Sequence, residues 1–581
     1  MAGKKFVAAI ALAGAVVGAG SLVLAQGGPR GPGGGAPPAP PEAPVVLLKT
    51  APADGKPQIN GPLVTGAGVN HWFQFRVPAT GDAPLAFSAE NLPAGLTIDA
   101  NTGIINGSIA SASATPVTIH IKNAKGEAAR GLVIVAGDHK LALTPPLGWN
   151  SWNCYGLNVS DEKIRAAADG MEKSGLAAHG FQYINIDDGW SNRGSGPNTR
   201  DPGGAILTNQ KFPDMKALGE YIHAKGLKFG IYSSPGPTTC GGCAATFQHE
   251  EQDARTWASW GVDYIKYDWC SYANVRDKPQ GLEGAKFPYQ VLREALNSLD
   301  RDVVFSLCQY GNNNVWEWGD EAGVKGNLWR VTGDISTGFN AWSSMSNIGF
   351  QQSPHSEFAG PGHWNDTDML IVGSVGLSNN GTPRPTSLTQ NEQMTHIGLW
   401  SMLAAPMLLG CDLNQLDEFT TNLMGNDEVL AVNQDPLGRQ AIRIAALHAN
   451  DEPVTASDVA TQPAPQPGRG RGRGPVNPFN AASKQIWARP LIDGTVAVGL
   501  FNLDNDPATV RISLKEIADG LKVDLAGPLP VRDLWKLTDL APVSDVVSAE
   551  VPRHGMVLLK IGNPKSQADC IAEIVKMYAS R

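Results

Sequence analysis

At 581 residues the chain is too long for one ordinary domain, so two or three domains are expected. Its hydrophobic fraction of 42% is normal for a globular protein, and its formal charge of -9 argues against a nucleic-acid binder, whose surface would be basic. Seven cysteines are an odd number, so at least one thiol is not paired within the chain. The fold must therefore rest on its cores rather than on a dense set of disulfides.

The first 25 residues have the three-part pattern of a secretory signal. Lys4 and Lys5 precede an uncharged apolar run from Phe6 to Ala25, and small residues near its end suit cleavage before Gln26. Left uncut, such a run is long enough to span a bilayer, so an N-terminal anchor is the alternative. We expect a signal peptide over residues 1–25 and an exported protein, periplasmic or secreted, that leaves the membrane after cleavage.

Residues 26–44 are rich in Gly and Pro and predict a flexible linker. From 45 to 137, short alternating runs such as Trp72 to Val77 are separated by turn residues and predict a β domain. The stretch from Leu92 to Gly107 resembles the immunoglobulin-like modules of bacterial exported enzymes. It carries no catalytic cluster, so we expect a spacer, with sugar binding as the alternative.

Between residues 144 and 437, short hydrophobic strands alternate with amphipathic helices. The expected strands are Tyr183 to Asp187, Leu227 to Tyr232, Val262 to Asp268, Val303 to Leu307 and Leu328 to Val331. One helix is expected from Met215 to Lys225, and another begins at the capping box of Thr389 and Glu392. This repetition predicts a (β/α)8 TIM barrel, with a doubly wound sheet as the alternative. Reactive side chains follow the strands, which is where barrel enzymes assemble their sites, and this favours the barrel.

After residue 437 the strands return without long helices, which predicts an antiparallel β-sandwich over residues 438–563. It is interrupted by a segment rich in Pro, Gly and Arg, expected to form a disordered surface insertion over residues 456–482. An RNA-binding arginine/glycine segment is the alternative, but the acidic charge and the expected export of the protein argue against RNA binding. Residues 564–581 predict a short helical tail.

Two aspartates at strand ends suit the chemistry of a retaining glycosidase. That reaction needs one carboxylate to attack the anomeric carbon and a second carboxyl group to protonate the leaving oxygen. Asp268 ends one expected strand and Asp334 follows another, and a barrel brings both ends to one pocket. Lys266 shares a strand face with Asp268 and would favour its ionised form.

Six motifs occur in one order along the chain: Thr144 to Asn153 (TPPLGWNSWN), Ile186 to Trp190 (IDDGW), Gly230 to Tyr232 (GIY), Lys266 to Asp268 (KYD), Trp329 and Arg330 with Asp334, and Trp364 to Met369 (WNDTDM). Together they resemble glycoside hydrolase family 27, the melibiase or α-galactosidase family. The resemblance is strong over residues 144 to 440 and implies a retaining exo-glycosidase that removes terminal α-D-galactosyl residues from oligosaccharides or polysaccharides, without a metal or other cofactor.

The resemblance also implies roles for individual residues. Asp268 matches the nucleophile and Asp334 the acid/base. The matching substrate-binding residues are Trp152, Asp187, Asp188, Tyr232, Lys266, Cys308, Gln309, Arg330, Asp368 and Met369. Asp187 and Asp188 match the pair that holds the 4- and 6-hydroxyls, and Cys240 and Cys270 match a disulfide beside the site. Cys240 and Cys243 otherwise form a CxxC pair, typical of a redox or half-zinc motif, and the lack of a second ligand pair argues against that alternative.

One segment departs from the family pattern. Many α-galactosidases have Cys-Glu-Trp where this chain has Cys308-Gln309-Tyr310, in a segment expected to face the sugar 2-position. Gln309 is about as bulky as Glu, which favours galactose with a free 2-hydroxyl. Within the family, β-L-arabinopyranosides and α-N-acetylgalactosaminides are the alternative substrates. A non-catalytic sugar-binding protein is the alternative from a different class.

Overall fold

The computed structural model describes residues 43–276, 278–376, 382–455 and 482–579. The expected signal peptide, nearly all of the linker and nearly all of the insertion at 456–482 lie outside these residues. Within the described ranges, no helix combines the length and apolar character needed to cross a membrane.

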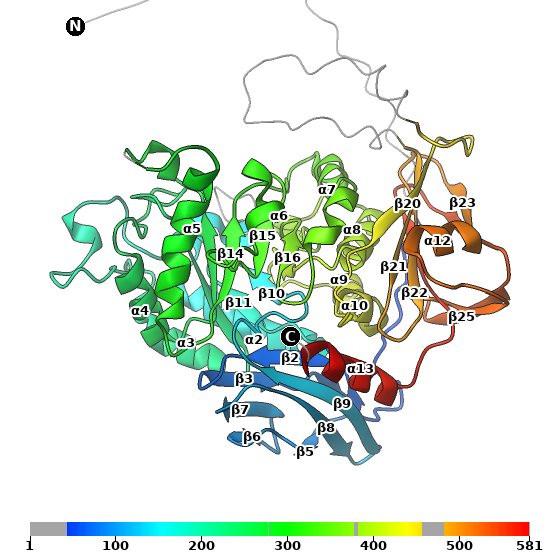
Figure 1. The fold of residues 1–581 in the computed structure, drawn as a ribbon, viewed down its shortest axis with the longest axis horizontal. Helices are drawn as coiled ribbons and strands as arrows, with labels where there is room; N and C mark the ends of the chain where they lie inside the picture. Colours follow the sequence, from blue (N-terminus) through cyan, green and yellow to red (C-terminus); the bar gives the residue numbers. More distant parts are fainter. Residues whose placement is uncertain (1–42, 277, 377–381, 456–481, 580–581) are drawn as a thin grey trace, which may run out of the picture. The chain divides into compact units, whose positions relative to one another are not determined.

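The central domain is a parallel eight-stranded barrel, as the sequence predicts (Figure 1). Neighbouring strands of the barrel pair in parallel. Beyond β16 the chain closes the barrel on β19, because Leu370 N–H donates to the Leu408 carbonyl at 2.8 Å. The strands, in the order in which they follow one another round the barrel, are β10 (Leu147–Asn150), β11 (Tyr183–Asn185), β12 (Lys228–Ser233), β13 (Tyr264–Asp268), β14 (Val304–Cys308), β15 (Leu328–Arg330), β16 (Trp364–Asp366) and β19 (Met407–Leu409).

Helices follow most of these strands and bury their apolar faces against the barrel. The longer ones are α2 (Asp161–Lys173), α3 (Met215–His223), α4 (Glu250–Trp260), α5 (Gly281–Asn297), α7 (Ala341–Gly349) and α8 (Gln390–Met402). The predicted capping box opens α8: the Thr389 hydroxyl accepts from Glu392 N–H, and the Glu392 carboxylate accepts from Thr389 N–H. Twelve of its residues, from Asn391 to Met402, are buried.

The N-terminal module is a sandwich of short strands around its own apolar core. One sheet has the order β2 (Val64–Ala67), β9 (Gly126–Ala136), β8 (Ser113–Asn123) and β5 (Ala86–Glu90), and the other has the order β3 (Trp72–Arg76), β7 (Ile104–Ser108) and β6 (Leu96–Ile98). A small pair, β1 (Gln58–Ile59) and β4 (Ala79–Thr80), completes it. The immunoglobulin-like architecture expected from the alternating pattern is therefore present.

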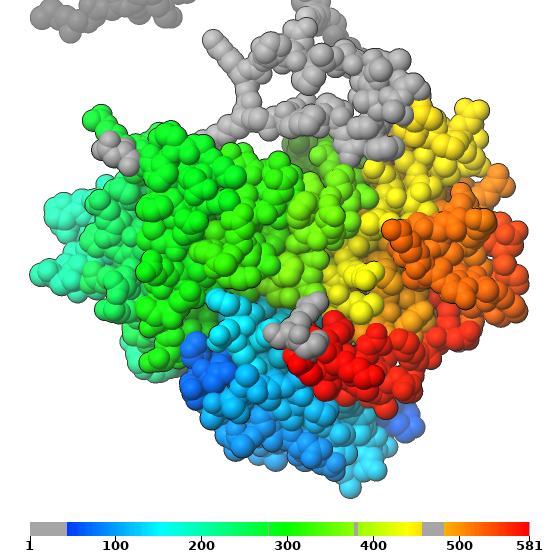
Figure 2. All heavy atoms as spheres, in the orientation of Figure 1, coloured from blue at the N-terminus to red at the C-terminus, as the bar shows by residue number. Residues whose placement is uncertain are grey.

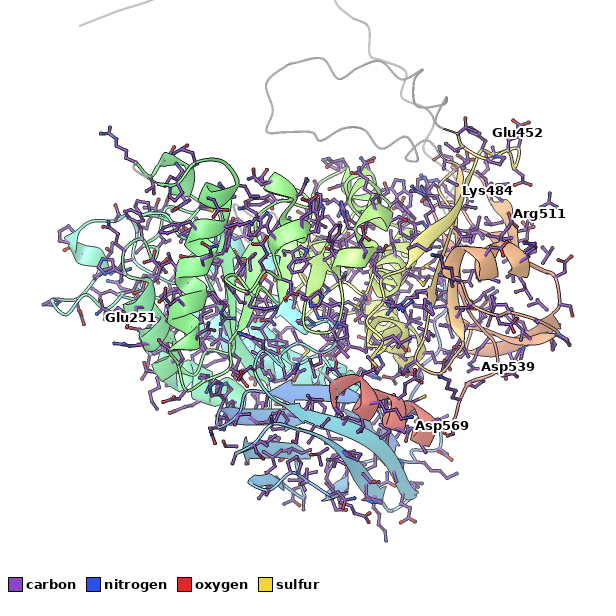
Figure 3. The ribbon with its side chains drawn as sticks, in the orientation of Figure 1. Glu251, Glu452, Lys484, Arg511, Asp539 and Asp569 are labelled. Carbon is purple, nitrogen blue, oxygen red and sulfur yellow. A yellow bond between two sulfur atoms is a disulfide. The ribbon has the colours of Figure 1, made fainter. Side chains whose placement is uncertain are left out.

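The C-terminal domain is an antiparallel sandwich with a separate core. Its larger sheet has the order β20 (Ile442–Leu447), β21 (Lys484–Pro490), β22 (Val496–Asn502), β27 (Met556–Ile561), β24 (Leu529–Asp533) and β25 (Thr538–Val543); the other pairs β23 (Ala508–Ser513) with β26 (Val546–Val551). Lys484 and Arg511 (Figure 3) both form ion pairs with Asp451, at 2.6 and 3.3 Å, so one carboxylate ties the two sheets together.

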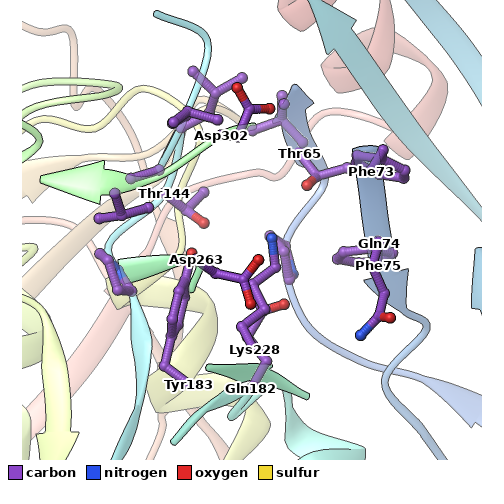
Figure 4. Close-up of a pocket in the computed structure, with 18 of the residues that line it drawn as sticks. Thr65, Phe73, Gln74, Phe75, Thr144, Gln182, Tyr183, Lys228, Asp263 and Asp302 are labelled. Carbon is purple, nitrogen blue, oxygen red and sulfur yellow. The ribbon is translucent and has the colours of Figure 1, made fainter. Parts of the chain in front are cut away.

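The N-terminal module contacts the end of the barrel where the strands begin. The Gln74 side chain donates to the carbonyl of Leu227, just before β12, and Gly68 N–H donates to the carboxylate of Asp302, just before β14. A cavity of about 50 Å³ remains between the two, lined by β3 and by barrel residues that include Tyr183, Lys228 and Asp263 (Figure 4). Ligand pockets usually have volumes of about 300 Å³ or more, so this space is too small to be one.

The predicted C-terminal tail is a helix, α13 (Gln567–Ala579), and it packs on the N-terminal module (Figure 2). Its buried residues Cys570, Ile574 and Tyr578 share a small core with Val133 and Val135 of β9. The Gln567 side chain also accepts a hydrogen bond from Gly131 N–H at 3.0 Å. The C-terminal helix α13 is therefore packed against the N-terminal module.

Candidate active site

A cavity of about 530 Å³ opens at the ends of the barrel strands. Polar side chains at or near the ends of strands β11, β12, β13 and β15 reach it. Of the residues predicted for the site, ten line this cavity: Trp152, Asp187, Asp188, Tyr232, Lys266, Asp268, Arg330, Asp334, Asp368 and Met369. Parallel strands put their carboxyl ends on one side of a barrel, which explains how positions more than 200 residues apart converge.

Asp268 lies at the end of β13 and is buried. Its Oδ1 accepts hydrogen bonds from Trp269 N–H at 2.7 Å and from the Tyr310 hydroxyl at 2.5 Å, and its Oδ2 accepts from the Tyr232 hydroxyl at 3.0 Å. Burial raises the pKa of Asp268, while Lys266 and these hydrogen bonds act to lower it. The carboxylate is thus held in a fixed orientation by donors from three segments.

Asp334 occupies a different environment, because 74% of its side chain is exposed. Arg330, which is buried, donates to Asp334 at 3.2 Å and pairs with Asp368 at 2.9 Å. Asp368 also accepts a hydrogen bond from Ile335 N–H at 2.8 Å, so it anchors the chain immediately after Asp334. The charge of Asp334 contributes to raising the pKa of Asp268, which places the two carboxyl groups within electrostatic reach.

Asp187 and Asp188 follow β11 and are both buried. Asp187 Oδ2 accepts from Lys266 Nζ at 2.8 Å, so the closest anionic partner of Lys266 is Asp187 rather than Asp268. Asp188 accepts from the Thr239 hydroxyl at 2.8 Å and from Gly241 N–H at 2.6 Å. A side chain at position 241 would meet the Asp188 carboxylate at 2.7 Å, which explains the glycine there.

The motif at the start of the barrel supports this carboxylate pair. The Asn150 side chain donates to Asp187 Oδ2 at 3.0 Å, and the Ser151 hydroxyl accepts from Asp187 N–H at 2.9 Å. The Asn150 side chain also accepts from Trp152 N–H and so fixes the start of α1 (Trp152–Tyr155), whose first residue is on the cavity wall. The motif is therefore a polar scaffold for Asp187 and an aromatic wall at Trp152.

Cys240 and Cys270 form a disulfide, as the resemblance implies. The bond joins the loop after β12 to the loop after β13, and Cys240 reaches the cavity. The other five cysteines, Cys154, Cys243, Cys308, Cys411 and Cys570, are free and buried. In the described part of the chain, the one His, Cys, Asp and Glu cluster of metal-binding size is Cys240, Asp268 and Cys270, and its two sulfurs are already bonded to each other.

Two predicted site residues do not line the cavity. Cys308 and Gln309 are fully buried and do not line the cavity, and both side-chain polar atoms of Gln309 lack a hydrogen-bond partner within the described ranges. Gln309 was expected to face the sugar, and in this structure its side chain is not part of the cavity wall. The backbone of Tyr310 has a positive φ of 59°, and it is the Tyr310 side chain that lines the cavity.

Tyr310 is one of the cavity-lining residues that the sequence did not predict. Its hydroxyl reaches Asp268, and its ring lies 5.7 Å from the guanidinium carbon of Arg330. The segment from Ile335 to Gly338, which follows Asp334, also lines the cavity and was not predicted to do so. One sequence signal could have identified Tyr310 and this segment. They follow β14 and β15, respectively, at the same barrel end as Asp268.

The chain is similar to known proteins over all three domains. Residues 144–435 match the family model for α-galactosidase A, residues 481–561 match its C-terminal β-sandwich domain, and residues 56–136 match an Ig domain model. α-Galactosidase A of Cellvibrio japonicus is 42% identical over 438 residues, which cover 73% of this chain and 93% of that protein.

Solved structures agree with this sequence similarity. A structure from Bacteroides fragilis is 33% identical with a TM-score of 0.74, covering 90% of this chain and 100% of the other. α-Galactosidase I of Mortierella vinacea is 31% identical with a TM-score of 0.60, covering 74% of this chain and 100% of the other. The chain belongs to the α-galactosidase A, or melibiase, family of glycoside hydrolases.

Proposed function

We propose that this glycoside hydrolase removes terminal α-D-galactosyl residues by double displacement, with Asp268 as nucleophile and Asp334 as acid/base. One observation carries the proposal: a single cavity holds a buried, hydrogen-bonded carboxylate and a second, exposed carboxyl group within electrostatic reach. The two environments suit the two roles, because the nucleophile needs a fixed orientation and the acid/base must exchange protons with water.

In the first step, an oxygen of Asp268 forms a bond to the anomeric carbon while the glycosidic bond breaks. The departing oxygen takes the electron pair and the proton of Asp334. In the second step, Asp334 takes a proton from water as that water attacks the anomeric carbon, and Asp268 leaves as a carboxylate. Two inversions give net retention, so an α-galactoside releases α-galactose.

The remaining cavity residues would bind the galactose ring. Asp187 and Asp188 keep lone pairs beyond those used by the protein, so each can accept a hydrogen bond from a sugar hydroxyl, here the 4- and 6-hydroxyls. Lys266 and Arg330 supply donors for ring hydroxyls, and Trp152 supplies an apolar wall. We propose that the substrates are galactose-containing oligosaccharides or polysaccharides. We also propose that the enzyme is exported, which the apolar run from Phe6 to Ala25 supports.

NMR of the sugar released early in turnover tests the proposal. We expect α-galactose first, and β-galactose as the first product would make the mechanism inverting and refute the pairing of Asp268 with Asp334. Asp268→Asn should lower kcat by about 10³-fold or more while galactose still binds, because the nucleophilic step is lost. A panel of aryl α-galactoside, α-N-acetylgalactosaminide and β-L-arabinopyranoside separates the substrate alternatives, and no turnover of any of them would favour a sugar-binding protein.

A further inference from the structure

The two oxygens of Asp268 are held unequally. Oδ1 accepts two short hydrogen bonds, from Tyr310 and from the backbone of Trp269, whereas Oδ2 accepts one longer bond from Tyr232. Strong donors stabilise negative charge on the oxygen that they contact. Oδ2 is therefore the oxygen that is freer to form a new bond.

Tyr310 reaches Oδ1 from a strained backbone conformation. It is not a glycine, yet its φ of 59° lies in the left-handed region, which costs such a residue about 1–2 kcal/mol. Hydrogen bonds on either side hold the turn: Gly311 N–H donates to the Arg330 carbonyl at 2.8 Å, and Asn312 N–H donates to the Gln309 carbonyl at 3.0 Å. Strain that is held in this way at a cavity wall is typical of residues placed for function.

We propose that Tyr310 is a positioning residue for the nucleophile, one that holds Oδ1 of Asp268 so that Oδ2 attacks the anomeric carbon. The inference rests on the proposed function, which makes Asp268 the nucleophile. In the first step, Oδ2 forms the new bond and Oδ1 becomes the carbonyl oxygen of the ester, still accepting from Tyr310. In the second step, the bond from Oδ2 to carbon breaks and its electron pair returns to the carboxylate, whose charge the Tyr310 hydroxyl stabilises.

Tyr310 gives no proton away in either step. Burial and the neighbouring Cys308, Asp268 and Asp334 raise the pKa of its hydroxyl far above the ordinary value for tyrosine, so it remains a donor. Loss of this donor should raise the pKa of Asp268 further, because the hydrogen bond favours the charged carboxylate. The other titratable or charged groups that face Asp268 are Asp187 and Asp188 after β11, Tyr232 on β12, Lys266 on β13, Tyr289 on α5, Cys308 on β14, Arg330 on β15 and Asp334 after it.

The test is Tyr310→Phe, which removes one hydroxyl and keeps the ring. We expect kcat/KM for an aryl α-galactoside to fall about 100-fold, the usual cost when a reacting group is no longer held in its attack geometry. The acid limb of the pH profile of kcat/KM should also move to higher pH, because free Asp268 then titrates at higher pH. With a dinitrophenyl galactoside, whose leaving group needs no proton, the covalent intermediate should accumulate and be visible by intact-protein mass spectrometry.

Tyr289→Phe is the matched control. The Tyr289 hydroxyl is also buried and within electrostatic reach of Asp268, but it has no hydrogen-bond partner within the described ranges. Its removal should leave both the rate and the acid limb unchanged. If Tyr310→Phe behaves like Tyr289→Phe, or if it loses activity with an unmoved acid limb, the positioning role is refuted. Failure of the proposed function itself would appear differently, as normal turnover by Asp268→Asn.

Discussion

At the scale of single residues, the proposed role of Asp188 in sugar binding predicts that binding depends on pH. Burial raises its pKa to about 6, and the charges of Asp187 and Asp268 add to this, while the hydrogen bonds from Thr239 and Gly241 act to lower it. The ionised form is the better acceptor for sugar hydroxyls. The inhibition constant for galactose should therefore increase as the pH falls through about 6.

Competitive inhibition by galactose, measured between pH 5 and 7.5, checks this expectation. Asp188→Asn should bind galactose more weakly and lose the dependence in that window. An inhibition constant that is flat with pH in the unmodified enzyme would contradict the assignment of Asp188 as an ionised acceptor.

The raised pKa of Asp188 affects folding stability in the opposite direction from sugar binding: its contribution to stability decreases as the pH rises. An unfolded aspartate gives up its proton near pH 3.9, whereas Asp188 in the folded protein keeps its proton up to about pH 6. Between these values the unfolded state binds fewer protons, so the contribution of Asp188 to the free energy of unfolding falls as the pH rises. The carboxylate that suits sugar binding is thus a local cost to folding.

Residue types and strand-end positions predict most of the cavity wall, because a parallel barrel fixes which ends meet. Gln309 and Tyr310 mark the limit of such reasoning. Which of two adjacent residues faces the cavity depends on the backbone conformation of the turn after β14, where Tyr310 has a positive φ. Tyrosine rarely adopts that conformation, so nothing in the sequence predicts the reversal.

At the scale of secondary-structure elements, α8 joins the barrel to the C-terminal sandwich. Besides closing the capping box, Glu392 pairs with His554 Nδ1 at 2.6 Å, and both side chains are buried. The His554 ring in turn stacks on Trp342 of α7, with ring centroids 4.2 Å apart. The first turn of α8 therefore carries both a helix cap and a contact between domains.

Thr389→Ala should lower the free energy of unfolding by about 1 kcal/mol, the usual effect of removing an N-cap hydroxyl. Urea denaturation followed by circular dichroism measures this as a lower midpoint. Thr389→Ser, which keeps the hydroxyl, should stay close to the original midpoint. Equal midpoints for the Ala and Ser variants would mean that the cap contributes nothing measurable.

Local signals of this kind explain which elements could be predicted. The α8 cap and the alternating run that became β3 depend on contacts within a short stretch of chain. β16 was not predicted, because two of its three residues, Asn365 and Asp366, are polar and give no apolar pattern. In the C-terminal sandwich, β25 and β26 are partly exposed and mix polar with apolar residues, so their pattern is weak.

At the scale of the whole molecule, the candidate active-site cavity and the N-terminal module lie at opposite ends of the barrel strands. The module contacts the segments that precede β12 and β14, whereas the cavity lies beyond the other ends of these strands. The module therefore does not contribute to the cavity wall. The sequence predicts a module and a helical tail, but their contact joins positions as far apart as Gly131 and Gln567, which no local pattern encodes.

The last helix should therefore matter to stability and not to catalysis. Ile574 of α13 is fully buried against the module, and truncating such a side chain to alanine typically costs about 2–5 kcal/mol. We expect Ile574→Ala to lower the melting temperature and to make the chain near α13 easier to cleave by protease. The kcat for an aryl α-galactoside, measured well below the melting temperature, should be unchanged.

Glu573→Ala on the same helix is the control, because Glu573 forms only a surface ion pair with Lys565, and such pairs contribute about 1 kcal/mol or less. A loss of kcat in Ile574→Ala at full folding would instead mean that the packing of α13 is transmitted through the barrel to the catalytic end.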